Sequence, residues 1–397
     1  MRTAVIFDIV RKNGGSYQMS LNNLITFVDN FKKNKIEYVV LTHKKNLDLD
    51  RLKIRYQIIK ISVWDYVFTI FQNIKILKFF LNILDIYSPF EKKLNKKNIH
   101  LLIFFFTSWK AFLLKKINFT VTVLDICHLD FKGKKKFKEI NICVFWFREY
   151  LLRNILPLAY CIITESEDLK IKIIRLYKLK FYSIVSIPNL PFMLLKKKKN
   201  LDTANKLKKK YKITGKFFIY PAQFWEHKNH IIILKAIEKL KSKKKNINFI
   251  FCGRDQGNLK NIKNKILEYG IQDNVKIIGY IKDDELLEFY KLSDALVMPT
   301  FFGPTNIPPV EAWSLKVPVL YSSLNINHGK NAALYFNPES VDQLIKVILK
   351  LDSKKTYKKL ILNGTKRLKD LKKDNKLGHK KFIFYISKFF NKNNKII

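Results

Sequence analysis

The sequence is poor in the residue clusters that hold metals or build disulfide frameworks. It contains four cysteines, and none of them forms a Cys-x-x-Cys motif or stands at metal-ligand spacing: Cys127, Cys143, Cys161 and Cys252. This pattern is typical of a chain whose thiols stay reduced and mostly buried. We therefore expect no metal, and no cofactor beyond a bound substrate, because no cluster of potential ligands has the spacing that a metal needs.

Long apolar runs are also missing. The most apolar stretch, Leu101–Phe106, meets Lys110 too soon to cross a bilayer, for which about 20 apolar residues are needed. The N-terminus, MRTAVIFDIV, runs directly into a predicted strand and lacks the layout of a signal peptide. We therefore expect a cytoplasmic protein, and a peripheral position on the inner face of the cell membrane stays open.

Acidic residues are few, since 32 Asp and Glu stand against 76 Lys and Arg, for a formal net charge of +44. Such an excess attracts polyanions, which include nucleic acid, anionic lipid and phosphorylated substrates. A biased genome composition is the competing explanation, because Lys, Ile, Asn and Phe are abundant together. Basic runs such as Lys196–Lys199 and Lys243–Lys245 fall where loops or helix ends are expected, and each alone indicates a solvated face. We do not expect nucleic acid as a partner, whereas an anionic membrane surface remains a candidate.

The chain of 397 residues is long enough for two domains. Strands alternate with helices in both halves, which indicates parallel sheets covered on both faces. We predict an α/β protein of two doubly wound, Rossmann-like domains that face a cleft, where ligands meet the carboxyl ends of the strands. The predicted parts are an N-terminal domain, a basic linker, a C-terminal domain and a helical tail that is a candidate to pack on the first domain: 1–195, 196–215, 216–370 and 371–397.

The segment TFFGPTNIPPVEAWSLKVPV, Thr300–Val319, predicts an anion site. A buried strand ends at Pro299, and a loop leads into a helix that begins at Pro308 or Pro309. Exposed amides at such a helix start, together with the helix dipole, bind anions. Glu311, placed in the first turn, is a candidate to accept hydrogen bonds from the hydroxyls of a ribose. The alternative is that Glu311 only complements the helix dipole.

A second strand, loop and helix occur in YPAQFWEHKNH, Tyr220–His230. Lys228 lies at the predicted helix start, where a cation is unfavourable for the dipole. A phosphate beside it would offset that charge. The alternative is one more surface lysine in a lysine-rich chain.

The first half offers weaker signals. Gly14 and Gly15 follow the first strand and precede a helix, so the backbone can approach a phosphate or sugar closely, although the full dinucleotide fingerprint is lacking. Asp125 and His128 come at or beyond the end of a buried strand, within TVLDICHLD. Each is equally compatible with a helix cap or a solvated loop residue.

Taken together, these segments resemble glycosyltransferase family 4, a large retaining family with the GT-B fold. The resemblance covers nearly the whole chain, and the donor motif GPTNIPPVEAWSLKVPV is its most specific part. The other matching segments are GGSYQ, YPAQFWEHKNH, FCGRDQGN and ALYFNPES. The GPTN loop is similar to that of a subgroup of the family.

The resemblance implies that the first domain is the acceptor side, that the second domain binds the nucleotide-sugar, and that each candidate residue has a role. Glu311 would hold the ribose of a nucleotide-sugar donor and Lys228 its diphosphate. Asp125 and His128, the candidate catalytic residues, would line the acceptor side. The remaining donor-binding candidates are backbone contacts in two loops: Gly14, Gly15, Gly303, Thr305, Asn306 and Ile307.

Three positions depart from the common family pattern. Gly303 stands where a first glutamate is frequent, Gln223 where an arginine precedes the lysine, and Leu124 where a histidine precedes the aspartate. The subgroup with the GPTN loop also lacks the first glutamate, so we interpret the departures as a subgroup trait. They leave the catalytic base unidentified.

The predicted function is retaining transfer of a hexosyl group from a nucleotide-sugar to a cell-surface glycan or a lipid-linked precursor. Two alternatives stay open: a sugar-nucleotide epimerase or hydrolase on the same fold, and a non-enzymatic basic protein that binds membrane or RNA. The stretch Val63–Lys97 mixes aromatic residues with lysines and predicts docking on an anionic membrane. Its alternative is a set of core aromatics beneath the first sheet.

Overall fold

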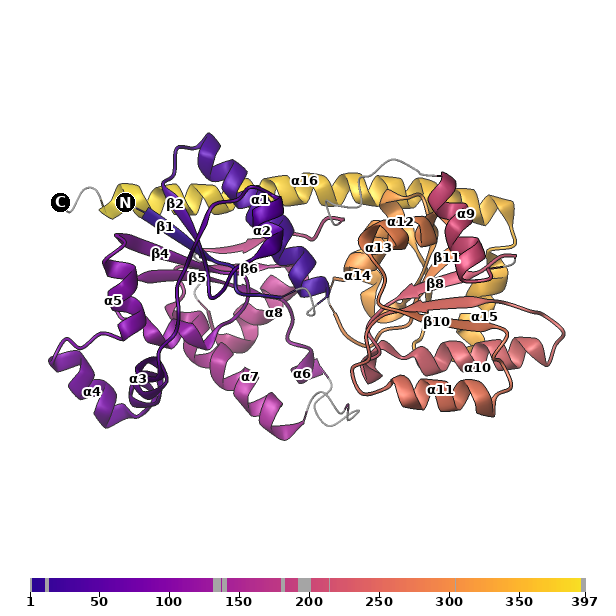
Figure 1. The fold of residues 1–397 in the computed structure, drawn as a ribbon, viewed down its shortest axis with the longest axis horizontal. Coiled ribbons are helices and arrows are strands. Elements are labelled where there is room, and N and C mark those ends of the chain that lie inside the picture. The colour runs from indigo at the N-terminus through magenta and orange to yellow at the C-terminus, as the bar shows by residue number, and fades with distance from the viewer. Residues whose placement is uncertain are drawn as a thin grey trace. The chain divides into compact units, whose positions relative to one another are not determined.

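The computed structural model describes residues 2–10, 14–130, 137, 141–179, 183–191, 201–213, 215–303 and 305–393 (Figure 1). The chain forms two compact units. Unit 1 combines Met1–Ile126, Ile142–Pro188 and Asn375–Ile397, and unit 2 combines Cys127–Asn141 with Asn189–Asp374.

Unit 1 contains a parallel sheet whose order, within the described residues, is β3-β2-β1-β4-β5-β6-β7. The central strand IHLLIF is almost continuously apolar, whereas its neighbour NFTVTV alternates apolar residues with buried threonines. The strands are β1 (Arg2–Ile6), β2 (Tyr38–Thr42), β3 (Tyr56–Ile58), β4 (Ile99–Phe104), β5 (Asn118–Val123), β6 (Cys161–Thr164) and β7 (Ile184–Ser186).

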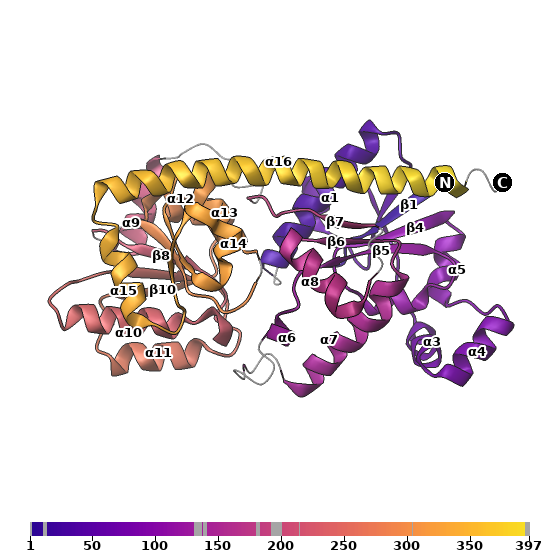
Figure 2. The same cartoon turned by 180° about the vertical axis from the view of Figure 1, so that it is seen from behind.

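Helices cover both faces of this sheet (Figures 1 and 2). Several begin at a side-chain cap, such as Ser166, which accepts a hydrogen bond from the Leu169 amide at the start of α8. The helical elements are α1 (Gly15–Lys33), α2 (Leu47–Arg51), α3 (Val63–Asn73), α4 (Lys75–Ile83), α5 (Pro89–Asn95), the 3-10 helix η2 (Trp109–Leu113), α7 (Ile142–Ile155), η3 (Leu156–Leu158), α8 (Glu167–Tyr177) and the C-terminal part of α16 (Lys354–Asn393).

Unit 2 contains a second parallel sheet, and its described strands have the order β10-β9-β8-β11-β12-β13. They are β8 (Phe218–Pro221), β9 (Phe249–Cys252), β10 (Val275–Gly279), β11 (Ala295–Met298), β12 (Val319–Ser322) and β13 (Leu334–Phe336). One face carries α9, α12 and α13, and the other carries α10, α11 and α15 (Figure 1).

The bounds of its helical elements follow the predicted alternation. They are α6 (Cys127–Asp130), α9 (Leu201–Lys210), η5 (Glu226–Lys228), α10 (His230–Lys241), α11 (Leu259–Glu268), α12 (Asp283–Leu292), α13 (Ile307–Ser314), η6 (Ser323–Asn325), α14 (Ile326–Gly329), η7 (Lys330–Ala332) and α15 (Val341–Lys350). The prediction of two α/β parts with parallel sheets is confirmed.

Two segments of the chain are assigned to the units differently from the predicted domain bounds. The predicted basic linker, 196–215, contains α9, whose Leu207 is buried in the core of unit 2. The predicted tail, 371–397, begins inside α16, a helix of 40 residues. A long amphipathic helix can contribute to two cores in succession, so its two parts are assigned to different units.

The C-terminal part of α16 packs tightly on unit 1. Asn375 donates from Nδ2 to the Pro188 carbonyl at 2.8 Å, and the Phe382 ring stacks on Phe27 at 4.7 Å. A Cβ atom on Gly378 would lie only 2.2 Å from the Ser186 carbonyl oxygen. The helix therefore approaches β7 at a distance that only glycine permits.

We expect Gly378→Ala to destabilise the protein by about 1–3 kcal/mol, because the added methyl forces the helix away from β7. At an exposed helix position, Gly→Ala raises the free energy of unfolding by roughly 1 kcal/mol. A decrease for Gly378→Ala would therefore indicate the close contact with β7. Denaturant unfolding measures it, with Lys376→Ala on the same helix as control. A Gly378→Ala protein as stable as wild type would contradict the close packing.

Candidate functional site

The candidate site lies where the strand order of unit 2 reverses, between β8 and β11. In open parallel sheets, ligands bind beyond the carboxyl ends of the strands at such a point. The loops that follow these two strands are joined: the Phe301 amide donates to the His227 carbonyl at 3.0 Å, and the His227 ring stacks on Phe302 at 4.4 Å. The two loops predicted to hold a nucleotide are thus neighbours.

The loop after β11 is built on Gly303 and Asn306. Gly303 has φ 99°, and a Cβ atom there would lie 2.8 Å from Asn306 Oδ1. Its carbonyl accepts hydrogen bonds from Asn306 Nδ2 at 3.3 Å and from Asn325 Nδ2 at 2.5 Å. Asn189 Nδ2 donates to Thr305 Oγ1 at 3.3 Å. Several side chains therefore fix the backbone of this loop.

The start of α13 is suited to an anion. Asn306 occupies the N-cap position, yet it makes no capping hydrogen bond, and its Nδ2 donates at 2.8 Å to the Tyr321 hydroxyl as well as to the loop. Pro308 and Pro309 have no N–H, so the Ile307 amide is the backbone donor at the start of this turn, and it has no side-chain cap among the described residues. This amide, together with the helix dipole, can bind a phosphate oxygen.

Glu311 lies on α13 and is only 2% exposed. Its Oε2 accepts a hydrogen bond from the Tyr290 hydroxyl at 2.9 Å, whereas its buried Oε1 has no hydrogen-bond partner among the described residues. Burial raises the pKa of Glu311 to about 7, against the opposing effect of the Tyr290 hydrogen bond. A buried carboxylate oxygen without a donor is costly unless a ligand supplies one.

The position of Glu311 corrects one detail of the sequence prediction. The helix begins at Ile307, before the two prolines, so its first turn contains no acidic residue and Glu311 follows that turn. This position does not support the alternative that Glu311 only complements the helix dipole, because that effect is confined to the first turn. The local sequence gave no reason to expect burial at this position.

Lys228 ends η5, just before α10. Its carbonyl accepts a hydrogen bond from the Tyr220 hydroxyl at 2.8 Å. The next residue, Asn229, has φ 58° and donates from Nδ2 to the carbonyls of Pro299 and Pro338, at 3.2 and 2.6 Å. The backbone that carries Lys228 is thus fixed on both sides, at the N-terminus of a 12-residue helix.

The candidates from the first half fall in different units. Gly14 has φ 61° and precedes α1, which begins at Gly15 in unit 1. Asp125, also in unit 1, accepts at Oδ1 from Arg148 Nη2 at 2.5 Å. His128 is buried on α6 in unit 2, where the neighbouring Cys127 accepts at Sγ from the Gly303 amide at 3.4 Å. Asp125 and His128, three positions apart in the chain, are thus assigned to different units.

Several supporting residues were not predicted. Tyr290 and Tyr321 lie on an amphipathic helix and a buried strand, where a tyrosine normally indicates only core packing. Their hydroxyl partners, Glu311 and Asn306, lie 21 and 15 positions away in sequence, and no local pattern links them. In the described part of the chain, no group of three or more His, Cys, Asp and Glu side chains is placed to hold a metal.

Part of the chain is similar to known glycosyltransferases. Residues 203–367, most of unit 2, match the family model of glycosyl transferases group 1. The chain is 26% identical over 224 residues to the O-antigen chain mannosyltransferase RfbU of Salmonella typhimurium, a stretch that covers 56% of this chain and 57% of the relative. The chain thus spans just over half the length of this curated relative.

Solved structures share the whole fold. A glycosyltransferase from Rickettsia africae superposes with a TM-score of 0.70 at 14% identity, over 97% of both chains. HepE of Anabaena, solved in complex with UDP-glucose, superposes with a TM-score of 0.70 at 13% identity, over 96% of this chain and 99% of its own. At such low identity, these matches establish the GT-B glycosyltransferase fold.

Proposed function

We propose that this protein is a retaining glycosyltransferase of family 4 that transfers a hexosyl group from a nucleotide-sugar bound by unit 2. The observation that carries the proposal is the buried Glu311 carboxylate, with one oxygen unpartnered among the described residues, on the helix whose uncapped start follows the GPTN loop. A ribose offers two adjacent hydroxyls, which are the donors that such an oxygen lacks. The match of unit 2 to glycosyl transferases group 1 supports the same reading.

In this mechanism the protein stabilises the departing nucleoside diphosphate. Lys228 supplies a positive charge beside the diphosphate, and the Ile307 amide at the start of α13 donates a hydrogen bond to one of its oxygens. Both groups are held by the backbone contacts described above, so they need little reorganisation as negative charge develops. We assign no protein nucleophile, and we propose that no metal takes part.

The proposed acceptor is a cell-surface glycan or its lipid-linked precursor. The likeness to an O-antigen chain mannosyltransferase supports this class, and mannose becomes the first hexose to test. Asp125, partly exposed and held by Arg148, is proposed to serve the acceptor directly. The buried His128 is proposed to act on the donor loop through the Cys127 contact with Gly303.

A thermal-shift screen of UDP, GDP, ADP and their hexose conjugates tests the donor proposal. A ligand at 100 times its dissociation constant adds about 2.7 kcal/mol of apparent stability, so the preferred base should stand out from the others. Release of nucleoside diphosphate that depends on an added glycan then separates a transferase from a hydrolase or an epimerase. Stabilisation by none of these nucleotides would exclude the proposed function.

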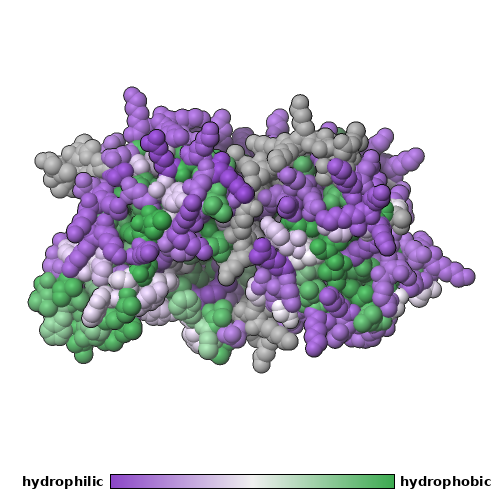
Figure 3. Space-filling model, viewed as in Figure 1, coloured by the Kyte–Doolittle hydropathy of each residue, from purple (hydrophilic) through white to green (hydrophobic). Residues whose placement is uncertain are grey.

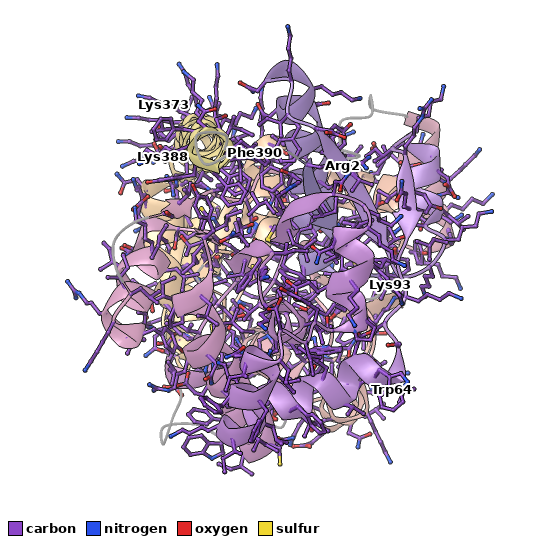
Figure 4. All side chains as sticks on the ribbon, turned by 90° about the vertical axis from the view of Figure 1, so that its left-hand side faces the viewer. Arg2, Trp64, Lys93, Lys373, Lys388 and Phe390 are labelled. Carbon is purple, nitrogen blue, oxygen red and sulfur yellow. The ribbon has the colours of Figure 1, made fainter. Side chains whose placement is uncertain are left out.

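We also propose that unit 1 docks on an anionic membrane. Exposed aromatic and aliphatic side chains gather on α3 and α4, and they form the green area over these helices in Figure 3. We call this the α3–α4 surface: Val63, Trp64, Ile70, Ile74, Ile76, Phe79, Phe80 and Ile83. Trp64, 71% exposed, extends from the edge of the molecule in Figure 4.

The chemistry of this surface favours lipid as its partner. Exposed lysines, Lys75 and Lys78, lie on α4 among the apolar residues, and the chain as a whole is strongly cationic. Apolar groups beside lysines suit the interface of an anionic bilayer, where each basic residue contributes about 1 kcal/mol. Within the described residues, no helix combines the length and apolar character needed to span a membrane.

We expect the protein to float with phosphatidylglycerol vesicles at low salt, and the triple change of Trp64, Phe79 and Phe80 to Ser to reduce the bound fraction about tenfold or more. Leu267→Ser is the control, because Leu267 is a 63% exposed apolar residue on α11 of unit 2. Equal binding of the triple variant and the control would rule out lipid insertion through the α3–α4 surface.

A further inference from the structure

Unit 1 has a largely buried ion pair at the point where its own strand order reverses. Asp8 comes directly after β1, Lys110 lies on η2 after β4, and β1 and β4 are neighbours at the centre of the sheet. The Lys110 ammonium group contacts Asp8 Oδ2, and the two side chains are 14% and 8% exposed. This position is the counterpart, in unit 1, of the β8–β11 position that carries the candidate donor site.

The Asp8 carboxylate is only half satisfied. Its Oδ1 is buried and has no hydrogen-bond partner among the described residues. A buried ion pair is weak evidence for stability, because the cost of removing both charges from water is offset only when further hydrogen bonds satisfy them. The missing bond at Asp8 Oδ1 therefore indicates a group that arrives from outside the chain.

The charge of the pair selects the kind of group. Asp8 and Lys110 cancel each other, and the nearby His43 is mainly neutral at pH 7, because burial lowers its pKa below the usual value. A phosphate needs a net positive site. A sugar, by contrast, offers hydroxyls that can donate to Asp8 Oδ1 and accept from Lys110 Nζ.

We propose that Asp8 and Lys110 form a subsite for the acceptor sugar, with Asp8 accepting from one ring hydroxyl and Lys110 donating to another. This proposal rests on the proposed glycosyltransferase function. The neighbour of Lys110, Trp109, stacks at 5.0 Å on Tyr66, an exposed residue of α3. The subsite is thus joined through η2 to the α3–α4 surface, which is where the lipid part of a lipid-linked acceptor would lie.

Saturation-transfer NMR on the full-length protein tests the subsite without a known acceptor. The probes are octyl glycosides of mannose, glucose, galactose and N-acetylglucosamine, each measured with the nucleoside diphosphate that stabilises the protein. We expect wild type to bind at least one glycoside. Asp8→Asn should raise the dissociation constant of that glycoside about tenfold or more, because a charge-assisted hydrogen bond is lost. The affinity for nucleoside diphosphate should stay within about twofold of wild type.

The control is Asp29→Asn, which removes the same charge from an exposed position on α1 and should change neither affinity. Lys110→Gln is the second variant, and it keeps the test possible if Asp8→Asn fails to fold. It should also weaken glycoside binding. Two results would overturn the subsite: glycoside binding by either folded variant equal to wild type, or no glycoside binding by a wild-type protein that binds nucleoside diphosphate. Absence of nucleotide binding in wild type would instead reject the proposed function.

Discussion

Glu311→Gln should weaken nucleoside diphosphate binding by about 10- to 100-fold, because a glutamine cannot accept charged hydrogen bonds from the ribose. The substitution keeps the volume of the side chain and an acceptor for the Tyr290 hydroxyl, which lies 2.9 Å from Glu311 Oε2. The fold should therefore persist. Calorimetry with the preferred nucleoside diphosphate measures the loss, and unchanged affinity would remove the ribose role from Glu311.

The same substitution should remove a pH dependence of stability. The pKa of Glu311 is raised from 4.5 to about 7 by burial, so the folded protein holds a proton that the unfolded chain has already lost. The free energy of unfolding of wild type therefore falls as pH rises from about 4.5 to about 7, by about 3 kcal/mol in total. The glutamine variant lacks this loss.

Denaturant unfolding at pH 5 and pH 8 isolates the effect. The difference in unfolding free energy between Glu311→Gln and wild type should shift by about 3 kcal/mol in favour of the variant over this interval. Glu268→Gln, on the exposed end of α11, should show no such shift. Nucleotide binding by wild type should strengthen over the same interval, because the ribose needs the ionised carboxylate. A pH-independent difference would mean that Glu311 is charged throughout.

The alternation of strands and helices was predictable because buried parallel strands are apolar runs that stand out from amphipathic helices. Two short elements of unit 1, α2 and β3, do not follow this pattern. They lie in LDLDRLKIRYQII, where charged residues interrupt every apolar run, and β3 has exposed residues. Their structure depends on pairing with β2 and on the Asn46 cap, which accepts from the amides of Asp48 and Leu49.

The candidate donor loops were predictable from strand, loop and helix order, together with the family resemblance. The hydrogen bonding of Glu311 was not predictable. One of its oxygens accepts from Tyr290, which lies 21 positions away, and the other has no partner among the described residues. Likewise, the pairing of Asp8 with Lys110 spans 102 positions and follows only from the neighbouring positions of β1 and β4. Local patterns predict which elements form, whereas the charge environment of a site is set by contacts between elements.

Lys228→Met should weaken nucleoside diphosphate binding by about 10- to 100-fold, and leave binding of the bare nucleoside within about twofold. The reason is that Lys228 stands at the start of α10, and a diphosphate there would be attracted by both the ammonium group and the helix dipole. Calorimetry with a nucleoside and the diphosphate of the same nucleoside measures the two affinities. Lys235→Met, at an exposed position on the same helix, is the control.

The stability of Lys228→Met provides an independent check, because its expected sign is opposite to that of binding. A cation at a helix N-terminus is unfavourable by about 0.3–1 kcal/mol, and the neighbouring His230 adds no charge, since burial lowers its pKa to about 3. Without nucleotide, the variant should therefore be at least as stable as wild type, and with nucleoside diphosphate it should be less stabilised. If Lys228→Met lowers stability without ligand and weakens nucleoside and nucleoside diphosphate equally, then Lys228 supports the loop and the diphosphate is bound elsewhere.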